Sequence, residues 1–428
     1  MKEISIAKLH RLFLSSAGVS IDTRKIQYGE IFFCLKGDNF NANLFAKKAL
    51  EAGAMYTIID EAEFYIDERT ILVSDVLETL QFLASFHRRQ FDIPFIGITG
   101  TNGKTTTKEL LNAVLSKHYK TYATAGNFNN HIGVPLTILS IPNDTDIAII
   151  EMGANHPGEI TELCKIAEPN YGIITSIGKA HLEGFGSLQG VINTKKELYE
   201  RVDMCAGKVF VNADNPLLMD LSKDLNRITY GQNDGAETLA KSVLGSPFAT
   251  LDWNGTIIKS QLVGAYNFDN MLAAICIAEY FRLDVNQIVS AIEEYEPKNK
   301  RSQWQTTDKN ELIIDAYNAN PSSMEAALNS FNTINSDNKW LILGDMLELG
   351  ADSEKEHQNI ITLLDQFPKD RLILVGPEFV KAANSKEFNI FINTAEAALW
   401  IETNPIEKAT ILIKGSRGIA LENLINLL

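Results

Sequence analysis

A glycine-rich turn contains the residue types that bind polyphosphate. Residues 97–107 read GITGTNGKTTT, with strand-forming apolar residues before the turn and helix-forming residues after it. Gly100 and Gly103 allow the backbone to bend so that several N–H groups and the positive end of the helix face one point. There Lys104 would lie along the β- and γ-phosphates, and the Thr105 hydroxyl would bind Mg²⁺. The turn therefore predicts a nucleotide site.

The turn departs from the strict P-loop pattern G-x-x-x-x-G-K-[ST]. Ile98 stands where the pattern has its first glycine, and Gly97 comes one residue earlier. A tight strand-to-helix turn without a ligand is therefore the alternative interpretation. The preceding strand and the following Lys-Thr pair favour the nucleotide site. The expected contacts are Gly100, Thr101, Asn102, Gly103, Lys104, Thr105 and Thr106.

Two more polar residues follow apolar strands. Glu151 ends the stretch IAIIE, and His181 lies in the glycine-rich segment SIGKAHLEGFGS. Because ligand sites of α/β sheets form at the carboxyl ends of the strands, both residues are expected near the nucleotide. Glu151 is a candidate Mg²⁺ ligand, directly or through water. A solvated carboxylate and a structural histidine are the alternatives.

The order of strands and helices predicts an α/β protein with three domains. Residues 1–88 form a small α/β region, residues 89–297 a mostly parallel sheet with the P-loop-type turn, and residues 298–428 a Rossmann-like region. The polar segment 298–303 would join the last two. No G-x-G-x-x-G occurs in the third region, so NAD binding is not indicated. Strands are expected at 94–99, 147–150, 172–176, 208–212, 312–315, 340–344, 372–375 and 410–413, and helices at 106–117 and 269–281.

Composition limits the class of protein. A chain of 428 residues is longer than one that folds around a single hydrophobic core, so more than one domain is expected. The net charge of -15 argues against a surface that binds nucleic acid. The four cysteines form no C-x-x-C pair, and the N-terminus has no apolar signal segment. No apolar stretch is long enough to span a membrane. We therefore expect a cytoplasmic protein that inserts into no membrane and binds no nucleic acid.

A series of blocks along nearly the whole chain resembles the Mur ligase family of peptidoglycan synthesis. The blocks are TGTNGKTTT, GNFNNHIGVP (126–135), EMGANHPGEI, HLEGFGS, DAYNANPSSM (315–324), GDMLELG (344–350) and KGSR (414–417). Their combination is most similar to the ligases that join D-alanyl-D-alanine to UDP-N-acetylmuramoyl-tripeptide and convert ATP to ADP and phosphate. The resemblance implies an N-terminal domain for the UDP end of the substrate, a central ATPase domain and a C-terminal domain that closes over the site. A monomer is expected.

The resemblance also implies two Mg²⁺ ions and a modified lysine. Thr105 and Glu151 would hold the first ion, and His181 would help to hold the second. Lys195 matches the lysine that reacts with CO₂ to give a carbamate over the second ion, with Lys196 as the neighbouring alternative. A carbamate replaces a cation that Mg²⁺ would repel by an oxygen-rich anion, whereas an exposed helix lysine is the alternative. The catalytic residues implied are Lys104, Glu151, His181 and Lys195.

Nucleotide and substrate contacts follow from further matches to the family. Asn267 and Asn270 match the block that reads adenine, with Tyr266 at the usual histidine position. Arg301 and Asp315 match positions that touch phosphate and ribose. For the uridine nucleotide, the implied contacts are Thr23 and Arg24, although the nearby residues 41–43 read NAN where relatives often have D-A-H. For the remaining parts of the substrates, the implied contacts are Asn127, Asn318, Asn320, His357 and Arg417. The four of these that lie in the third region could instead be helix-cap or loop residues.

Three other functions stay open. The first is a ligase of the same family that adds lysine or diaminopimelate, but the D-N-P sequence at 214–216 lies outside the third region, where that branch carries it. The second is a folylpolyglutamate synthetase-like ligase, which the GANHPGEI, YNANPSSM and GDMLELG blocks do not suit. The third is a non-catalytic ATP-binding switch, which the presence of Glu151, His181 and Lys195 disfavours.

Overall fold

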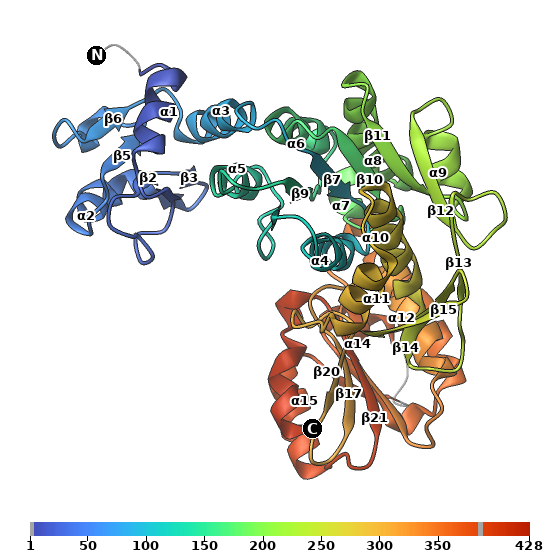
Figure 1. The fold of residues 1–428 in the computed structure, drawn as a ribbon. Helices are drawn as coiled ribbons and strands as arrows, with labels where there is room; N and C mark the ends of the chain where they lie inside the picture. Colours follow the sequence, from blue (N-terminus) through green and yellow to red (C-terminus); the bar gives the residue numbers. More distant parts are fainter. Residues whose placement is uncertain (1–3, 384–387) are drawn as a thin grey trace.

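The computed structural model describes residues 4–383 and 388–428 as a bent molecule built around three large sheets (Figure 1). A four-stranded sheet lies at the N-terminal end, a nine-stranded sheet at the bend and a six-stranded sheet at the other end. The predicted α/β class is confirmed. The strands predicted from the sequence are all present, with ends shifted by at most two residues. The exact domain boundaries stay predictions.

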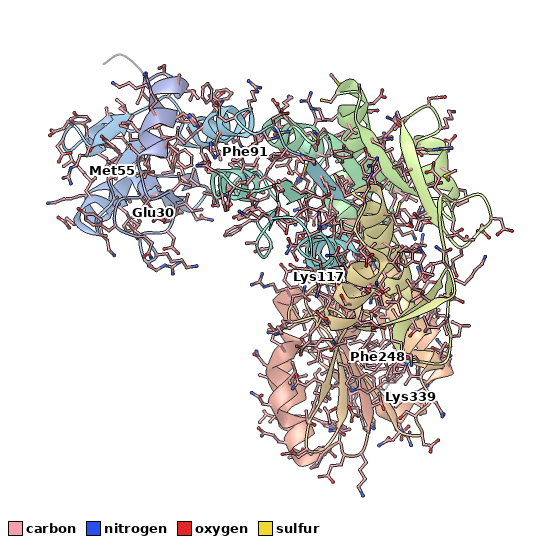
Figure 2. All side chains as sticks on the ribbon, viewed as in Figure 1. Glu30, Met55, Phe91, Lys117, Phe248 and Lys339 are labelled. Atoms are coloured by element: carbon pink, nitrogen blue, oxygen red, sulfur yellow. The ribbon has the colours of Figure 1, made fainter. Side chains whose placement is uncertain are left out.

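The first sheet is fully parallel, and its helix α3 leads into the second sheet. Asp75 caps α3 by accepting a hydrogen bond from the Glu78 N–H at 2.7 Å. The apolar face of α3 packs on α1 and also on α5 and α6, so one core runs from the first sheet into the second. Figure 2 shows Phe91 at this junction. The elements are α1 (Ile6–Leu14), β1 (Val19–Ser20), β2 (Ile31–Phe33), the hairpin β3 (Lys36–Gly37) and β4 (Phe40–Asn41), α2 (Ala46–Glu51), β5 (Tyr56–Ile59), β6 (Thr70–Leu72) and α3 (Val76–Arg88).

The second sheet has the strand order β15-β14-β13-β12-β11-β10-β7-β9-β8 and is parallel from β8 to β13. Helices α4, α10 and α11 cover one face, while α5, α6 and α8 cover the other. Strands β12 to β15 were not predicted. In β15, for example, an exposed apolar residue, Ile257, and a buried polar residue, Ser260, break the apolar/polar alternation that indicates a strand. The strands are β7 (Phe95–Thr99), β8 (Thr121–Ala123), β9 (Ile147–Glu151), β10 (Tyr171–Ile174), β11 (Lys208–Asn212), β12 (Arg227–Gly231), β13 (Thr238–Ser242), β14 (Phe248–Trp253) and β15 (Thr256–Val263). The helices are α4 (Lys104–Leu115), α5 (Gly133–Leu139), α6 (Glu159–Ala167), α7 (Leu182–Phe185), α8 (Leu188–Met204), α9 (Pro216–Leu221), α10 (Phe268–Tyr280) and α11 (Val285–Glu294).

The third sheet has the order β16-β17-β21-β18-β19-β20 and is parallel except for the edge strand β16. An irregular segment, 295–302, leads into it from α11. Phe248, labelled in Figure 2, packs on Trp304 of β16 with ring centres 5.5 Å apart. The elements are β16 (Gln303–Thr306), β17 (Glu311–Asp315), α12 (Pro321–Thr333), β18 (Lys339–Gly344), α13 (Ser353–Leu363), β19 (Leu372–Val375), α14 (Pro377–Ala382), β20 (Asn389–Phe391), α15 (Thr394–Thr403) and β21 (Thr410–Lys414).

Strand order places the glycine-rich turn at the centre of the second sheet. The turn follows β7, which lies between β9 and β10, so the carboxyl ends of all three strands meet there. The chain crosses from one side of β7 to the other between β9 and β10, which is the type of position where open α/β sheets bind ligands. In the described part of the chain, none of the helices has both the length and the apolar character needed to cross a bilayer.

Candidate active site

The turn between β7 and α4 needs glycine at two positions. Gly100 and Gly103 have φ of +151° and +82°, and a Cβ on either would lie within 2.4 Å of a neighbouring side chain. The N–H groups of Thr101 and Asn102 donate to the carbonyl and the hydroxyl of Ser176, at 2.8 and 2.9 Å. The N–H groups of the first turn of α4 have no intrahelical partners. These donors, rather than those of Thr101 and Asn102, are left for a phosphate.

Lys104 lies over the turn that it follows. Its Nζ donates to the carbonyls of Gly100 and Thr101 at 2.7 and 3.1 Å. Burial lowers the pKa of Lys104 to about 8, while the carboxylate of Glu151 acts in the opposite direction. The side chain therefore places an ammonium group beside the positive end of α4, where phosphate oxygens are favoured.

Glu151, at the end of β9, is a buried carboxylate with one unused oxygen. Its Oε1 accepts hydrogen bonds from the Thr105 hydroxyl at 3.1 Å and from the Asn129 amide at 2.8 Å. Its Oε2 has no hydrogen-bond partner, and the nearest cation is Nζ of Lys108 at 3.6 Å. Asn129 and Lys108 are site residues that sequence analysis did not assign, although Asn129 lies in the GNFNNHIGVP block.

The groups around Glu151 fit a magnesium ion that a nucleotide completes. The free carboxylate oxygen and the neighbouring Thr105 hydroxyl are hard oxygen donors. Within residues 4–383 and 388–428, no three His, Cys, Asp or Glu side chains are grouped to hold a metal. Mg²⁺ usually binds to one or two carboxylates together with phosphate oxygens and water, so this small set is sufficient.

His181 lines the cavity but already has a carboxylate partner. It precedes α7 with a left-handed φ of +50°. Its Nδ1 forms an ion-pair contact with Oε2 of Glu348, which comes from the loop after β18 in the third sheet. This close contact with His181 lowers the pKa of Glu348. Sequence analysis did not assign Glu348 a role.

Lys195 and Lys196 differ sharply in their surroundings. Lys195 on α8 is 2% exposed, and burial lowers its pKa to about 7, with the charge of Lys104 adding to the shift. Lys196 points outward and pairs with Glu200 at 2.9 Å. Nζ of Lys195 lies 5.5 Å from the centre of the Phe185 ring, which also contacts the ring of His181. Lys195 therefore lies close behind His181 but does not itself line the cavity.

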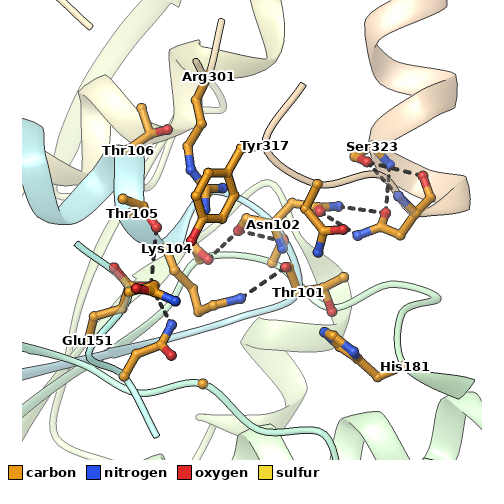
Figure 3. A pocket seen from close by; sticks show the side chains of 18 of the residues that line it. Thr101, Asn102, Lys104, Thr105, Thr106, Glu151, His181, Arg301, Tyr317 and Ser323 are labelled. Carbon is orange, nitrogen blue, oxygen red and sulfur yellow. Dashed lines mark hydrogen bonds between the residues drawn. The ribbon is translucent and has the colours of Figure 1, made fainter. Parts of the chain in front are cut away.

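One cavity of about 610 Å³ lies between the second and third sheets (Figure 3). On the third-sheet side, the Arg301 guanidinium lies 3.8 Å from the centre of the Tyr317 ring, and its buried Nε has no hydrogen bond. Asp315 pairs with Lys414 at 2.5 Å. The predicted site residues that line the cavity are Thr101, Asn102, Gly103, Lys104, Thr105, Thr106, Asn127, Glu151, His181, Asn267, Asn270, Arg301, Asp315, Asn318 and Asn320.

The predicted adenine-reading amides are engaged in the protein. Asn267 donates to the Val263 carbonyl and accepts from the Asn270 amide, both at 2.8 Å. Asn270 in turn accepts from the Thr107 hydroxyl at 3.0 Å, which ties α10 to α4. One amide hydrogen and one lone pair of Asn267 remain for a ligand. Tyr266 hydrogen-bonds through its hydroxyl to Ser302 at 2.9 Å.

The predicted substrate contacts divide into three groups. Asn318 and Asn320 line the cavity. The amide of Asn320, which precedes α12 of the third-sheet region, also donates a hydrogen bond at 2.8 Å to Asn102 in the turn after β7 of the second sheet. Arg417 is exposed, and its guanidinium lies 5.6 Å from the Tyr317 ring centre. Thr23 and Arg24 lie in the turn after β1, near the distant first sheet, and do not line this cavity. Arg24 pairs with Asp22 at 2.8 Å.

The prediction that His357 contacts substrate is not supported by its position. The side chain is fully buried on α13, away from the cavity. Its Nε2 accepts from the Met346 N–H at 3.1 Å, and its Nδ1 donates to the Ser353 carbonyl at 2.7 Å. Nε2 therefore holds the loop after β18, while Nδ1 is bonded within α13. The sequence shows a lone histidine in a helix, which does not reveal such burial.

Known proteins resemble the chain over nearly its full length. The family models for the Mur ligase middle domain and for the Mur ligase, glutamate ligase domain match residues 98–278 and 300–417. The UDP-N-acetylmuramoyl-tripeptide--D-alanyl-D-alanine ligase of Bacillus subtilis is 33% identical, covering 95% of this chain and 92% of its own. A crystal structure of MurF from Acinetobacter baumannii is 28% identical with a TM-score of 0.86, covering 97% of both chains. The MurF ligase of Thermotoga maritima in complex with ADP shares the fold, with 24% identity, a TM-score of 0.85 and 97% coverage of both chains.

Proposed function

The chain belongs to the Mur ligase family, and from this premise we propose that it joins D-alanyl-D-alanine to UDP-N-acetylmuramoyl-tripeptide at the expense of ATP. One observation carries the proposal beyond family membership. A single cavity has phosphate-directed groups on the second-sheet side, Lys104 and the first turn of α4, and Arg301 on the third-sheet side. Such a cavity suits a reaction in which a nucleotide and an acceptor must meet under a closing domain.

The proposed chemistry activates a carboxylate, because a carboxylate is a poor acylating agent for an amine. An oxygen of the tripeptide's terminal carboxylate attacks the γ-phosphorus of ATP, and ADP leaves. The amine of D-alanyl-D-alanine then attacks the carbonyl carbon of the acyl phosphate, loses a proton and expels phosphate. Lys104 and Arg301 would balance the developing negative charge, and the enclosed cavity would protect the acyl phosphate from water.

Thr105 and Glu151 are the proposed ligands of a Mg²⁺ ion. The chemistry supplied by such an ion is neutralisation of phosphate oxygens. The support is the unused, buried Oε2 of Glu151 next to the Thr105 hydroxyl and the positive end of α4. Nζ of Lys108 lies 3.6 Å from this same oxygen and partly balances its charge.

The second ion is proposed only for the carbamylated form of Lys195. His181 is paired with Glu348, and the unmodified amine of Lys195 offers no oxygen atom to a metal. Without carbamylation, His181 and Lys195 therefore do not form a metal site. A buried amine with a pKa of about 7 has a large neutral fraction at neutral pH. Its nitrogen can attack the carbon of CO₂ and lose a proton, which leaves a carbamate anion. Lys196 lacks this burial.

The test uses the purified protein with ATP, Mg²⁺ and UDP-N-acetylmuramoyl-tripeptide. D-alanyl-D-alanine, a diamino acid or glutamate is added in parallel reactions, and the products are identified by mass. Of the three amines, only D-alanyl-D-alanine should give ADP and a pentapeptide nucleotide. The Lys104→Met variant should give neither product. Borohydride trapping should detect the acyl phosphate. Release of no ADP with all three reactants would refute the proposal, and a product with another amine would assign one of the related ligases.

The location and assembly that accompany this function are also proposals. The substrates ATP and a UDP-linked peptide are cytoplasmic metabolites, which supports a cytoplasmic enzyme. A monomer is proposed as well, because the resemblance to the family implies one.

A further inference from the structure

The loop after β18 brings a carboxylate of the third sheet to the histidine of the second. Glu348 and His181 both have left-handed backbones, with φ of +64° and +50°. Such conformations are unfavourable for residues other than glycine and gather at functional sites. Nδ1 of His181 is buried and makes no hydrogen bond in the described part of the chain, so its polar partner is the Glu348 carboxylate through the close ion-pair contact alone. The contact therefore joins two unfavourable backbone positions that lie far apart in the sequence.

Buried hydrogen bonds fix the loop that presents Glu348. The Met346 N–H donates to Nε2 of His357 at 3.1 Å, and the Leu347 N–H donates to the Ser416 hydroxyl at 3.0 Å. The carboxylate of Asp345 accepts from the first N–H groups of α14 at 2.8 and 2.9 Å. His357, Ser416 and Asp345 are all buried. The GDMLELG and KGSR blocks thus cooperate to hold one short segment in place.

A carboxylate on one ring nitrogen of a histidine determines what the other nitrogen can do. When Nδ1–H is held by an acceptor, Nε2 is unprotonated and keeps its lone pair. In His181 the Nδ1 atom is buried while the ring lines the cavity, and Figure 3 shows the ring directed toward Thr101. The lone pair is then available to a cation or to a hydrogen-bond donor in the cavity.

We propose that Glu348 is a positioning residue, which fixes the orientation and the tautomer of His181 only when the third domain is docked. The proposal rests on the proposed function, in which His181 acts at the reaction site. Since Glu348 and His181 belong to different sheets, separation of the domains removes the partner of Nδ1. A reactive arrangement of His181 would thereby be tied to closure.

A second ion pair between the same two segments supplies a matched control. Lys179 lies two residues before His181 and pairs with Glu356 on α13 at 2.7 Å. This pair also joins the second and third sheets, but it touches neither ring nitrogen of His181. A residue that only holds the domains together should behave like Glu356.

The experiment compares full-length wild type with Glu348→Ala, Glu348→Gln and Glu356→Gln. Nitrogen-15 labelling of the seven histidines reports the tautomer of each ring by NMR, and a His181→Gln spectrum identifies the His181 signals. His357, whose Nδ1–H is fixed by Ser353, serves as an internal reference. Steady-state kcat and KM are measured on the same preparations.

We expect the wild type to show His181 protonated at Nδ1, and Glu348→Ala to lose this signature with a fall in kcat of about 10- to 100-fold. Glu348→Gln keeps an acceptor oxygen, so it should retain the tautomer and most of the rate. Glu356→Gln should leave the tautomer unchanged. An unchanged tautomer and kcat in Glu348→Ala would overturn the positioning role, as would equal effects in a Glu356→Gln protein whose small-angle scattering matches that of wild type. A wild type that forms no product would instead refute the proposed function, while the tautomer comparison would still be decisive for Glu348.

Discussion

At the scale of single residues, the site divides into groups that a local motif predicts and groups that only the fold brings in. Lys104, Thr105 and Glu151 could be predicted because a glycine turn and a strand end show them directly in the sequence. Asn129, Lys108 and Tyr317 could not be assigned, since their partners lie on other segments and polar residues of these types are common in loops. Glu348 is the extreme case, because it reaches His181 from a separate sheet.

The burial of Lys195 leads to a prediction that separates it from its neighbour. Lys195→Ala should lower kcat by about 100-fold or more if a carbamate is needed to balance charge at the site. Acetate or formate should restore part of the rate by occupying the space of the carbamate. Lys196→Ala is the matched control and should retain full activity, because that side chain is exposed. Carbon-13 NMR with labelled CO₂ should show a carbamate in wild type and in Lys196→Ala, but not in Lys195→Ala. Full activity of Lys195→Ala would exclude this role.

Tyr317 should affect nucleotide binding through Arg301. The half-buried guanidinium of Arg301 has the Tyr317 ring as its close partner, and Arg417 approaches the same ring. Replacing the ring by leucine should raise the KM for ATP and the Kd for ADP about 2- to 10-fold, because one cation–π contact is lost. Tyr317→Phe keeps the ring and should stay close to wild type. Equal effects of the two substitutions would point to the hydroxyl instead of the ring.

At the scale of elements, the strands that build the site were the most predictable part of the fold. β7, β9, β10 and β11 are buried on both faces and appear in the sequence as short apolar runs between helices. Strands β13 to β15 form an antiparallel extension with one face partly exposed, and their alternating pattern was missed. Their pairing depends on neighbours that the sequence does not reveal.

A pair of buried histidines between α1 and α3 predicts a pH-dependent stability. Nε2 of His10 lies 3.1 Å from Nδ1 of His87, and burial lowers the pKa of His87 to about 4, with the charge of His10 adding to the shift. The unfolded chain has a histidine pKa near 6.5. As the pH falls from 6.5 to 4, the unfolded state therefore binds a proton that the folded state does not, and roughly 3 kcal/mol of stability is lost.

The measurement is the free energy of unfolding against pH, followed by hydrogen exchange in α1 and α3. His87→Leu should flatten the dependence between pH 6.5 and 4.5, although it changes packing at every pH. His118→Leu is the control, because that histidine is exposed. A wild-type NMR titration of His87 near pH 6.5 would contradict the prediction.

At the scale of the whole molecule, the two junctions differ in character. The first and second sheets share an apolar core through α3, so separating them would expose apolar surface to water. The second and third sheets meet around the cavity through polar contacts, including Asn102 with Asn320, Lys179 with Glu356 and His181 with Glu348. Their apolar contact is smaller and is made by Val263, Phe248 and Tyr266 against the core of the third sheet. We therefore expect the third sheet to move relative to the second, while the first and second sheets move together.

Charge reversal at Lys179 and Glu356 tests whether polar pairs hold the third domain in place. Lys179→Glu or Glu356→Lys alone places like charges together and should raise the radius of gyration in small-angle scattering and the KM for ATP. The double reversal restores opposite charges, so it should recover part of both values, with a coupling of about 1 kcal/mol between the sites. Because Lys179 is partly exposed, high salt should reduce the difference between single and double variants. If the double variant is as open as the single ones, this pair does not control docking, and the apolar contact of Phe248 with Trp304 becomes the main link between these domains.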